Sequence, residues 1–193
     1  AAAILVLMIS PAGPGAVKTG LDNIASYHDM FRGKRIGIIT NHTGYNGEGR
    51  HITDVFAEMD GVKITALFGP EHGIRGTKAA GEKIDSKTSE TEDIPVYSLY
   101  GKTQKPTSEM LKNVDVLVFD IQDVGARFYT YTYTMSLAME AAAENGKRFV
   151  VLDRPNPING LAVEGNILQP QFASFVGLYP IPVRHGMTVG ELA

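Results

Sequence analysis

Short apolar runs and amphipathic segments alternate along most of this chain. Apolar runs of four to eight residues, bounded by turn residues, are typical of buried strands. The sequence predicts such strands at residues 35–40, 63–68, 95–100, 114–119 and 148–152. Apolar residues at helical spacing predict helices at residues 20–31, 51–59, 107–112 and 131–145. Strands that alternate with helices predict an α/β fold, with a parallel sheet covered by helices on both faces.

The two ends of the chain depart from this pattern. Residues 1–9 form one apolar run, and residues 10–16 are rich in proline and glycine. A membrane span needs about 20 apolar residues, so this run is too short. It is typical of a signal peptide that has lost its basic start, followed by a linker, and the alternative is a buried first strand. At the other end, residues 188–193 begin like a helix and then stop.

We therefore expect residues 1–16 to be a partial signal peptide with its linker. Residues 17–193 are expected to form one domain that is truncated on its C-terminal side. The leader-like start predicts a secreted or periplasmic bacterial protein. The polar stretch at residues 76–93 predicts a long exposed loop.

Composition narrows the classes of function. The 193 residues are 44% hydrophobic, which is enough to bury a core. With 18 basic and 21 acidic residues the net charge is −3, so no electrostatic footprint for nucleic acid is present. The absence of cysteine excludes disulfides, thiolate zinc sites and a cysteine nucleophile.

Polar side chains gather where predicted strands end. In a parallel sheet these ends lie at one edge, where open α/β sheets bind their ligands. The candidates follow four different strands and are Asn41 and His42, then Glu71, His72 and Arg75, then Asp120, Gln122, Asp123 and Arg127, and finally Asp153, Arg154 and Asn156. The sequence therefore predicts a site built from four loops.

The densest of these loops is residues 69–76, Gly-Pro-Glu-His-Gly-Ile-Arg-Gly. Its glycines and proline force a sharp turn directly after a strand. A carboxylate, an imidazole and a guanidinium fall within five positions, at Glu71, His72 and Arg75. Clustered ionisable groups on a loop indicate a functional site, and the alternative is an ordinary solvated loop.

Several kinds of chemistry lack their motifs. Neither GxGxxG nor GxxxxGK[ST] occurs, which disfavours nucleotide binding, and no GxSxG nucleophile elbow is present. A divalent ion held by Glu71, Asp120 and Asp123 remains an alternative, but no HExxH accompanies these residues. We accordingly expect no metal and no cofactor.

With these alternatives disfavoured, catalysis by carboxylate side chains is the chemistry that the candidate residues favour. Paired carboxylates cleave glycosidic bonds, at a separation of about 5–5.5 Å for retention or roughly 6.5–9.5 Å for inversion. Glu71 and Glu164 are candidates, although Glu164 is equally a surface or cap carboxylate. Asp120 alternatively holds a neighbouring arginine, Arg127 or Arg154. Among the nearby tyrosines, Tyr129 and Tyr131 are expected in the cleft and Tyr133 in the core.

Four motifs together carry a resemblance that covers residues 17–193. They are Asn41-His42-Thr43-Gly44, residues 68–76, residues 120–131 and Leu152-Asp153-Arg154-Pro155-Asn156-Pro157. Their sequences and order resemble the exo-β-N-acetylmuramidases of the NamZ type, long catalogued as a bacterial domain of unknown function. The resemblance implies a Rossmann-like N-terminal domain, with a site in the cleft beside a smaller C-terminal domain that this chain lacks. Many members are exported.

The resemblance also implies a reaction, the release of N-acetylmuramic acid from non-reducing ends of peptidoglycan fragments. It maps the catalytic pair onto Glu71 and Glu164. We expect muramyl sugars to be positioned by the other polar residues at the strand ends, namely Asn41, His42, His72, Arg75, Asp120, Asp123, Arg127, Tyr129, Arg154 and Asn156. Two alternatives are a non-catalytic module that binds cell-wall glycans and a metal- or nucleotide-dependent enzyme. The oligomeric state is left open.

Overall fold

The computed structural model describes residues 4–7, 17–71, 73–74, 87–88 and 94–193. Within them the strands are β1 (Ile4–Leu7), β2 (Arg35–Thr40), β3 (Lys63–Gly69), β4 (Lys87–Thr88), β5 (Pro95–Ser98), β6 (Val116–Asp120) and β7 (Arg148–Leu152). The α-helices are α1 (His28–Phe31), α2 (Ile52–Ala57) and α3 (Tyr131–Glu144). Two 3-10 helices are η1 (Ile24–Tyr27) and η2 (Pro170–Phe172).

The described strands form one sheet in the order β1-β7-β6-β2-β3-β5-β4. All pairs in it are parallel except β4 with β5, which is antiparallel. From β2 the chain passes through α2 to β3 on one side, whereas β6 pairs with the other side of β2. The direction of winding therefore changes between β2 and β6. At such a point the loops diverge and leave room for a ligand at the carboxyl ends of the strands.

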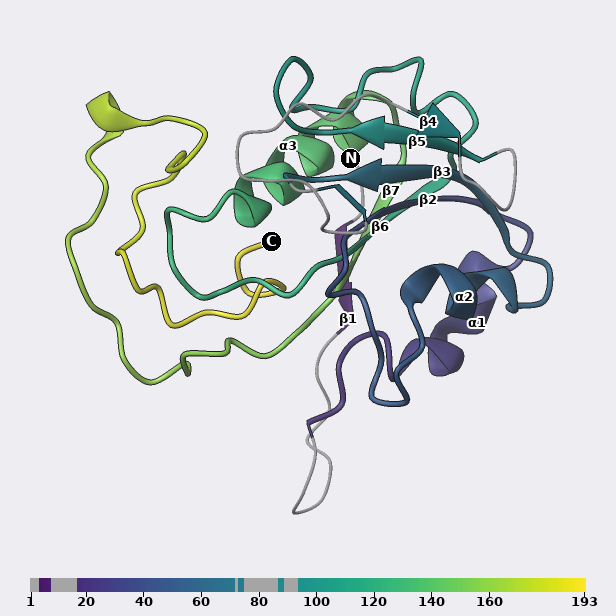
Figure 1. Cartoon of the computed structure of the whole chain (residues 1–193), viewed down its shortest axis with the longest axis horizontal. Helices are drawn as coiled ribbons and strands as arrows, with labels where there is room; N and C mark the ends of the chain where they lie inside the picture. The colour runs from purple at the N-terminus through teal and green to yellow at the C-terminus, as the bar shows by residue number, and fades with distance from the viewer. Residues whose placement is uncertain (1–3, 8–16, 72, 75–86, 89–93) are drawn as a thin grey trace.

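Helices cover both faces of the sheet, with α3 on one face and α1 and α2 on the other (Figure 1). Neighbouring residues of β2 face opposite layers, as strand geometry requires. Ile39 belongs to the core cluster that contains Met135 of α3, and Ile38 to the cluster that contains Phe56 of α2. The predicted Rossmann-like α/β architecture is confirmed.

The predicted strands are all present, with ends that differ by no more than two residues. The predicted long helix is α3, which ends one residue earlier than expected, and α2 lies within the predicted 51–59. Tyr133 is fully buried, as its assignment to the core required. These elements have strong apolar patterns, because the central strands are buried on both faces and the helices bury one face against the sheet.

The segment 20–31 is only partly helical, and its first turn was wrongly predicted as helix. Thr19 donates hydrogen bonds from its N–H and its hydroxyl to the Asp22 carboxylate, at 2.7 and 2.8 Å. Such local bonds compete with those of a helix. In addition, the N–H of Gly20 donates to the Asp153 carbonyl at 2.7 Å, and a Cβ at Gly20 would lie 2.6 Å from the Asp153 nitrogen. The close approach fixes this segment to the end of β7.

The short helix predicted at 107–112 is also wrong, since these residues form hydrogen-bonded turns. Leu111 donates to the Thr107 carbonyl at 3.2 Å, but the bonds that follow span three residues rather than four. Helix nucleation is costly, so a six-residue segment with few apolar anchors does not propagate.

The N-terminal apolar segment contributes an edge strand. β1 runs parallel to β7, with Ile4 opposite Phe149 and Leu7 opposite Leu152. The alternative of a first strand is therefore what the structure contains at residues 4–7, and the signal-peptide interpretation of 1–16 stays a prediction. In the part of the chain that the structure describes, no helix is both long and apolar enough to cross a bilayer. Apart from β4, the polar stretch at 76–93 lies outside the described residues.

Beyond β7 the chain forms a long, mostly irregular segment, drawn from green to yellow in Figure 1, which extends away from the sheet before it returns. Asp153 anchors the returning end, since its carboxylate accepts hydrogen bonds from the Thr188 hydroxyl and the Gly190 N–H at 2.9 and 2.7 Å. This irregular segment carries exposed apolar side chains, including Leu161 and Phe172, which are 96% and 68% exposed.

A buried ion pair joins the ends of β6 and β7. Arg154 donates from Nε and Nη2 to the two oxygens of Asp120, at 2.6 and 3.0 Å. Its Nη2 also donates to the Tyr45 carbonyl at 3.0 Å, which brings in the loop after β2. Asp120 is fully buried and Arg154 is 6% exposed. Burial raises the pKa of the Asp120 carboxyl, and the Arg154 guanidinium opposes that rise.

Replacing Arg154 by methionine leaves the Asp120 carboxyl buried without its partner. We expect Arg154→Met to lower the free energy of unfolding, measured by urea titration, by about 3–5 kcal/mol. The double variant Asp120→Leu/Arg154→Met removes both groups and should recover much of that loss. Arg35→Met is the matched control, because it breaks the Arg35–Asp115 pair, whose side chains are 44% and 35% exposed. A loss for Arg154→Met no larger than for this control would contradict the assignment.

Candidate active site

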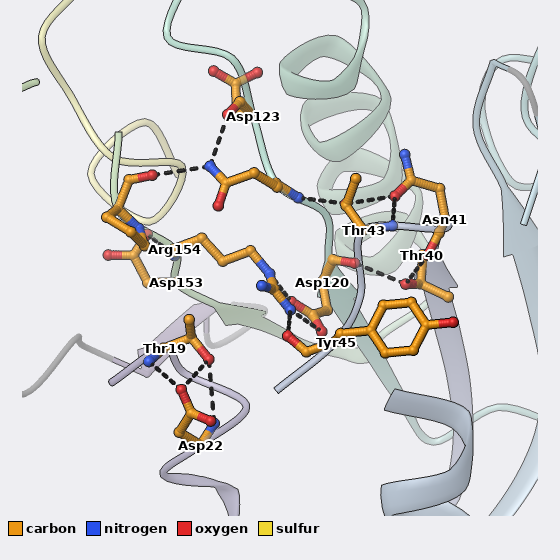
Figure 2. Close-up of polar contacts among 12 residues, drawn as sticks. Thr19, Asp22, Thr40, Asn41, Thr43, Tyr45, Asp120, Asp123, Asp153 and Arg154 are labelled. Atoms are coloured by element: carbon orange, nitrogen blue, oxygen red, sulfur yellow. Dashed lines mark hydrogen bonds and ion pairs between the residues drawn. The ribbon is translucent and has the colours of Figure 1, made fainter. Parts of the chain in front are cut away.

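The loops after β2, β6 and β7 meet at the carboxyl edge of the sheet, as predicted, and they are joined by hydrogen bonds (Figure 2). The N–H of Gln122, after β6, donates to the Thr43 hydroxyl, after β2, at 2.9 Å. The Gln122 amide donates to the Pro155 carbonyl, after β7, at 2.9 Å. Gln122 thus connects all three loops.

Asn41 is held rigidly behind this edge. Its Oδ1 accepts hydrogen bonds from the Thr43 hydroxyl and N–H at 2.6 and 2.9 Å, which fixes the orientation of the amide (Figure 2). Its side chain is fully buried, and its amide interacts with Tyr131, the first residue of α3. Asn41 therefore connects the loop after β2 to the start of that helix. His42, the next residue, is exposed on the same turn.

Glu71 lies half-buried just after β3, among hydroxyl groups. The Thr130 hydroxyl, at the start of α3, donates to Glu71 Oε2 at 3.2 Å. Glu71 also forms a hydrogen bond with Tyr100, which follows β5, and this bond raises the pKa of the tyrosine. Burial raises the pKa of Tyr131, the charge of Glu71 adds to the rise, and the Asn41 amide opposes it. The carboxylate therefore faces hydroxyls from two different elements of the fold.

Two aspartates, Asp120 at the end of β6 and Asp123 in the loop after it, are bound within the protein. Asp120 is occupied by Arg154 in the buried pair, which is the alternative that the sequence left open for it. Asp123 accepts hydrogen bonds from the Gly125 N–H at 2.7 Å and from the Thr132 hydroxyl at 3.3 Å. Both carboxylates shape the edge of the sheet in this structure. Among the described residues, no group of three or more His, Asp or Glu is arranged to hold a metal ion.

Glu164 lies on the irregular segment after β7, and its side chain is 66% exposed. Its Oε2 accepts a hydrogen bond from Arg184 Nη1 at 3.0 Å. The two residues also pair through their backbones, and Arg184 forms a second backbone bridge with Ala126 in the loop after β6. Both candidate glutamates are thus attached to the segment between β6 and α3, Glu164 through Ala126 and Glu71 through Thr130.

The remaining predicted residues have mixed surroundings. Arg127 donates from Nη1 to the carbonyls of Asn166 and Ile181, both at 2.7 Å, so it fastens the irregular segment. Asn156 Nδ2 donates to the Met187 carbonyl at 2.9 Å. Tyr129 is 45% exposed, and its ring lies 5.5 Å from that of Phe128. His72 and Arg75 lie outside the described residues.

Sequence reasoning missed Tyr100 and Arg184. Tyr100 follows β5, so the strand-end rule that selected its neighbours would also have selected it. Arg184 offered no such signal, because it lies in an irregular segment far along the chain from Glu164 and only the fold brings the two together.

Comparisons with known proteins agree with this architecture. A family model described as exo-beta-N-acetylmuramidase NamZ, N-terminal, matches residues 36–193. The chain is 61% identical over 178 residues to the peptidoglycan beta-N-acetylmuramidase NamZ of Bacillus subtilis (strain 168), covering 92% of this chain and 43% of that protein.

Two crystal structures of DUF1343 family proteins from Bacteroides fragilis NCTC 9343 are also similar. One is 50% identical with a TM-score of 0.83 and covers 91% of this chain and 44% of its own. The other is 40% identical with a TM-score of 0.78 and covers 92% of this chain and 46% of its own. The chain therefore spans less than half the length of these relatives. Because the family model matches most of the chain, this protein belongs to the NamZ family of exo-β-N-acetylmuramidases and corresponds to its N-terminal part.

Proposed function

We propose that this chain supplies the carboxylates of a glycoside hydrolase that releases N-acetylmuramic acid from the non-reducing ends of peptidoglycan fragments. The observation that carries the proposal is Glu71, half-buried at the carboxyl edge of the sheet and surrounded by the hydroxyls of Thr130, Tyr100 and Tyr131. The similarity to a peptidoglycan beta-N-acetylmuramidase from Bacillus subtilis supports it.

The reaction needs two carboxyl groups. Water adds across the glycosidic bond, its oxygen going to the anomeric carbon of the muramyl sugar and a proton going to the leaving oxygen of the aglycone. One glutamic acid donates that proton, and the other carboxylate either activates the water or first attacks the sugar. Glu71 and Glu164 are the proposed pair, because both are attached to the segment between β6 and α3.

Recognition of the muramyl group requires a partner for its lactyl carboxylate. A guanidinium suits that role because its planar donors match a carboxylate. Arg154 is occupied by Asp120, and Arg127 donates to the carbonyls of Asn166 and Ile181, so we propose Arg75 for this contact. The exposed rings of Phe128 and Tyr129, beside Thr130, offer faces on which a sugar ring would stack.

The activity is tested with MurNAc-GlcNAc as substrate and free MurNAc as the measured product, using the protein as its gene encodes it in full. We expect release by the wild type and a loss of at least about 100-fold in kcat for Glu71→Gln and for Glu164→Gln, because each removes a proton-transfer or nucleophilic group. Glu109→Gln is the matched control, since Glu109 is 83% exposed on the turns before β6. EDTA should leave the rate unchanged.

Two results would contradict this proposal. If the wild type binds the disaccharide without releasing MurNAc, the protein is a glycan-binding module rather than an enzyme. If release persists in Glu71→Gln at the rate of Glu109→Gln, another group carries the chemistry.

We also propose export, with the apolar run at residues 1–9 as part of a signal peptide and residues 10–16 as its linker. Removal of the signal peptide and the pairing of β1 with β7 exclude each other in the mature protein, because β1 lies within residues 1–9. N-terminal sequencing of the protein purified from its native host should show a start after residue 9. A mature protein that retains Ile4–Leu7 would contradict the proposal.

A further inference from the structure

Arg184 contacts Glu164 through both backbone and side chain, and sequence reasoning gave it no role. We propose that Arg184 is a positioning residue, which holds the Glu164 carboxylate in one orientation for its part in the reaction. This inference rests on the proposed glycosidase function and adds a positioning residue to it.

The backbone sets the two side chains opposite one another. Glu164 N–H donates to the Arg184 carbonyl at 3.1 Å, and Arg184 N–H donates to the Glu164 carbonyl at 2.9 Å. In such an antiparallel pair the two side chains point to the same face. Gly165 follows with φ of +84°, and a Cβ there would lie 2.7 Å from Val183 Cβ, so this position needs glycine. The pairing is therefore built into the local backbone.

The Arg184 guanidinium binds one oxygen of the Glu164 carboxylate and leaves the rest of the carboxylate accessible to solvent. Arg184 Nη1 lies 3.0 Å from Glu164 Oε2, while Nη2 donates to the Ile158 carbonyl, which fixes the plane of the guanidinium. The Arg184 side chain is 25% exposed, whereas that of Glu164 is 66% exposed. A substrate or a water molecule can thus reach the carboxylate without displacing the arginine.

The frame behind Arg184 is rigid. Arg184 bridges Ala126, and the neighbouring Arg127 N–H donates to the Val183 carbonyl at 2.8 Å. The next residue, His185, is buried, with Nε2 3.7 Å from Asp123 Oδ2. These contacts fasten Arg184 to the same segment whose far end carries Thr130, the hydroxyl donor to Glu71.

Arg184 thus gives Glu164 a charged donor whose plane is itself fixed. Charge-assisted bonds of this kind are shorter and stronger than bonds between neutral groups, so they hold a carboxylate in one orientation. A reacting carboxylate in a glycosidase needs such an orientation, because a small misplacement costs much of the rate.

The test compares Arg184→Met with Arg184→Lys, alone and combined with Glu164→Gln. We expect Arg184→Met to lower the kcat of MurNAc release by about 100-fold with little change in KM, because a small misplacement of a reacting group has an effect of this size. Arg184→Lys keeps the charge but not the planar fork and should recover part of the loss. The double variant Arg184→Met/Glu164→Gln should be no slower than Glu164→Gln alone, since Arg184 acts through Glu164.

Arg35→Met is the matched control, because it breaks an arginine–aspartate pair at the opposite end of the sheet and should retain wild-type activity. Additive losses in the double variant would show that Arg184 only fastens the segment, and would overturn the proposal. So would an Arg184→Met protein with wild-type kcat.

A second experiment does not depend on catalysis, so it tests the contact between Arg184 and Glu164 separately from the proposed function. Carbodiimide-driven coupling of an amine to Glu164, followed by mass spectrometry, should be faster in Arg184→Met than in wild type, because the carboxylate loses its partner. Arg35→Met should leave coupling at Glu164 unchanged. Equal coupling rates in Arg184→Met and wild type would overturn the inference even if the protein releases MurNAc. If no MurNAc is released while coupling changes as expected, the proposed function falls, and the catalytic role of Arg184 falls with it.

Discussion

At the carboxyl edge of the sheet, Arg154 is held between the Asp120 carboxylate and the Tyr45 carbonyl. Three segments that are distant in the chain end at this guanidinium. Taking charged groups out of water is expensive, so the pair is tolerable only with all of its donors placed well. The hydrogen bonds of Arg154 therefore fix the positions of β6, β7 and the loop after β2 relative to one another. These three segments form the frame on which the surrounding polar residues are arranged.

The neighbouring contacts extend that frame toward the candidate glutamates. Gln122 connects three loops, and its N–H orients the Thr43 hydroxyl that in turn fixes Asn41. The segment between β6 and α3 then contacts Glu71 through Thr130 and Glu164 through the Ala126–Arg184 bridge. The two candidate glutamates, which come from distant parts of the chain, are thus both attached to this frame.

Much of the fold was predictable from the sequence because its signals are local. The strand β6 is buried on both faces, which its unbroken apolar run indicates, and α3 buries Met135, Ala138 and Ala142 at helical spacing. The helix predicted from residue 20 failed because Thr19 and Asp22 bond to each other and Gly20 packs against the backbone of β7, which is a contact with a distant strand. No pattern within the segment contains that information.

In the candidate site, too, some residues could be predicted from local sequence, whereas contacts between distant segments could not. The strand-end rule found Glu71, and it found Asp120 together with its possible partner Arg154. It could not show that Asn41 would be sealed from solvent or that Arg127 would bind two carbonyls of the irregular segment. The contact between Glu164 and Arg184 depends on a backbone pairing across 20 residues of mostly irregular chain, for which no sequence signal exists.

The irregular segment that carries Glu164 also carries Leu161, Ile167 and Phe172, which are 96%, 60% and 68% exposed. Large apolar side chains on an exposed segment are surface through which a protein can contact a partner or another copy of itself. Any contact that buried these side chains would also restrict access to Glu164, because both lie on the same stretch of chain.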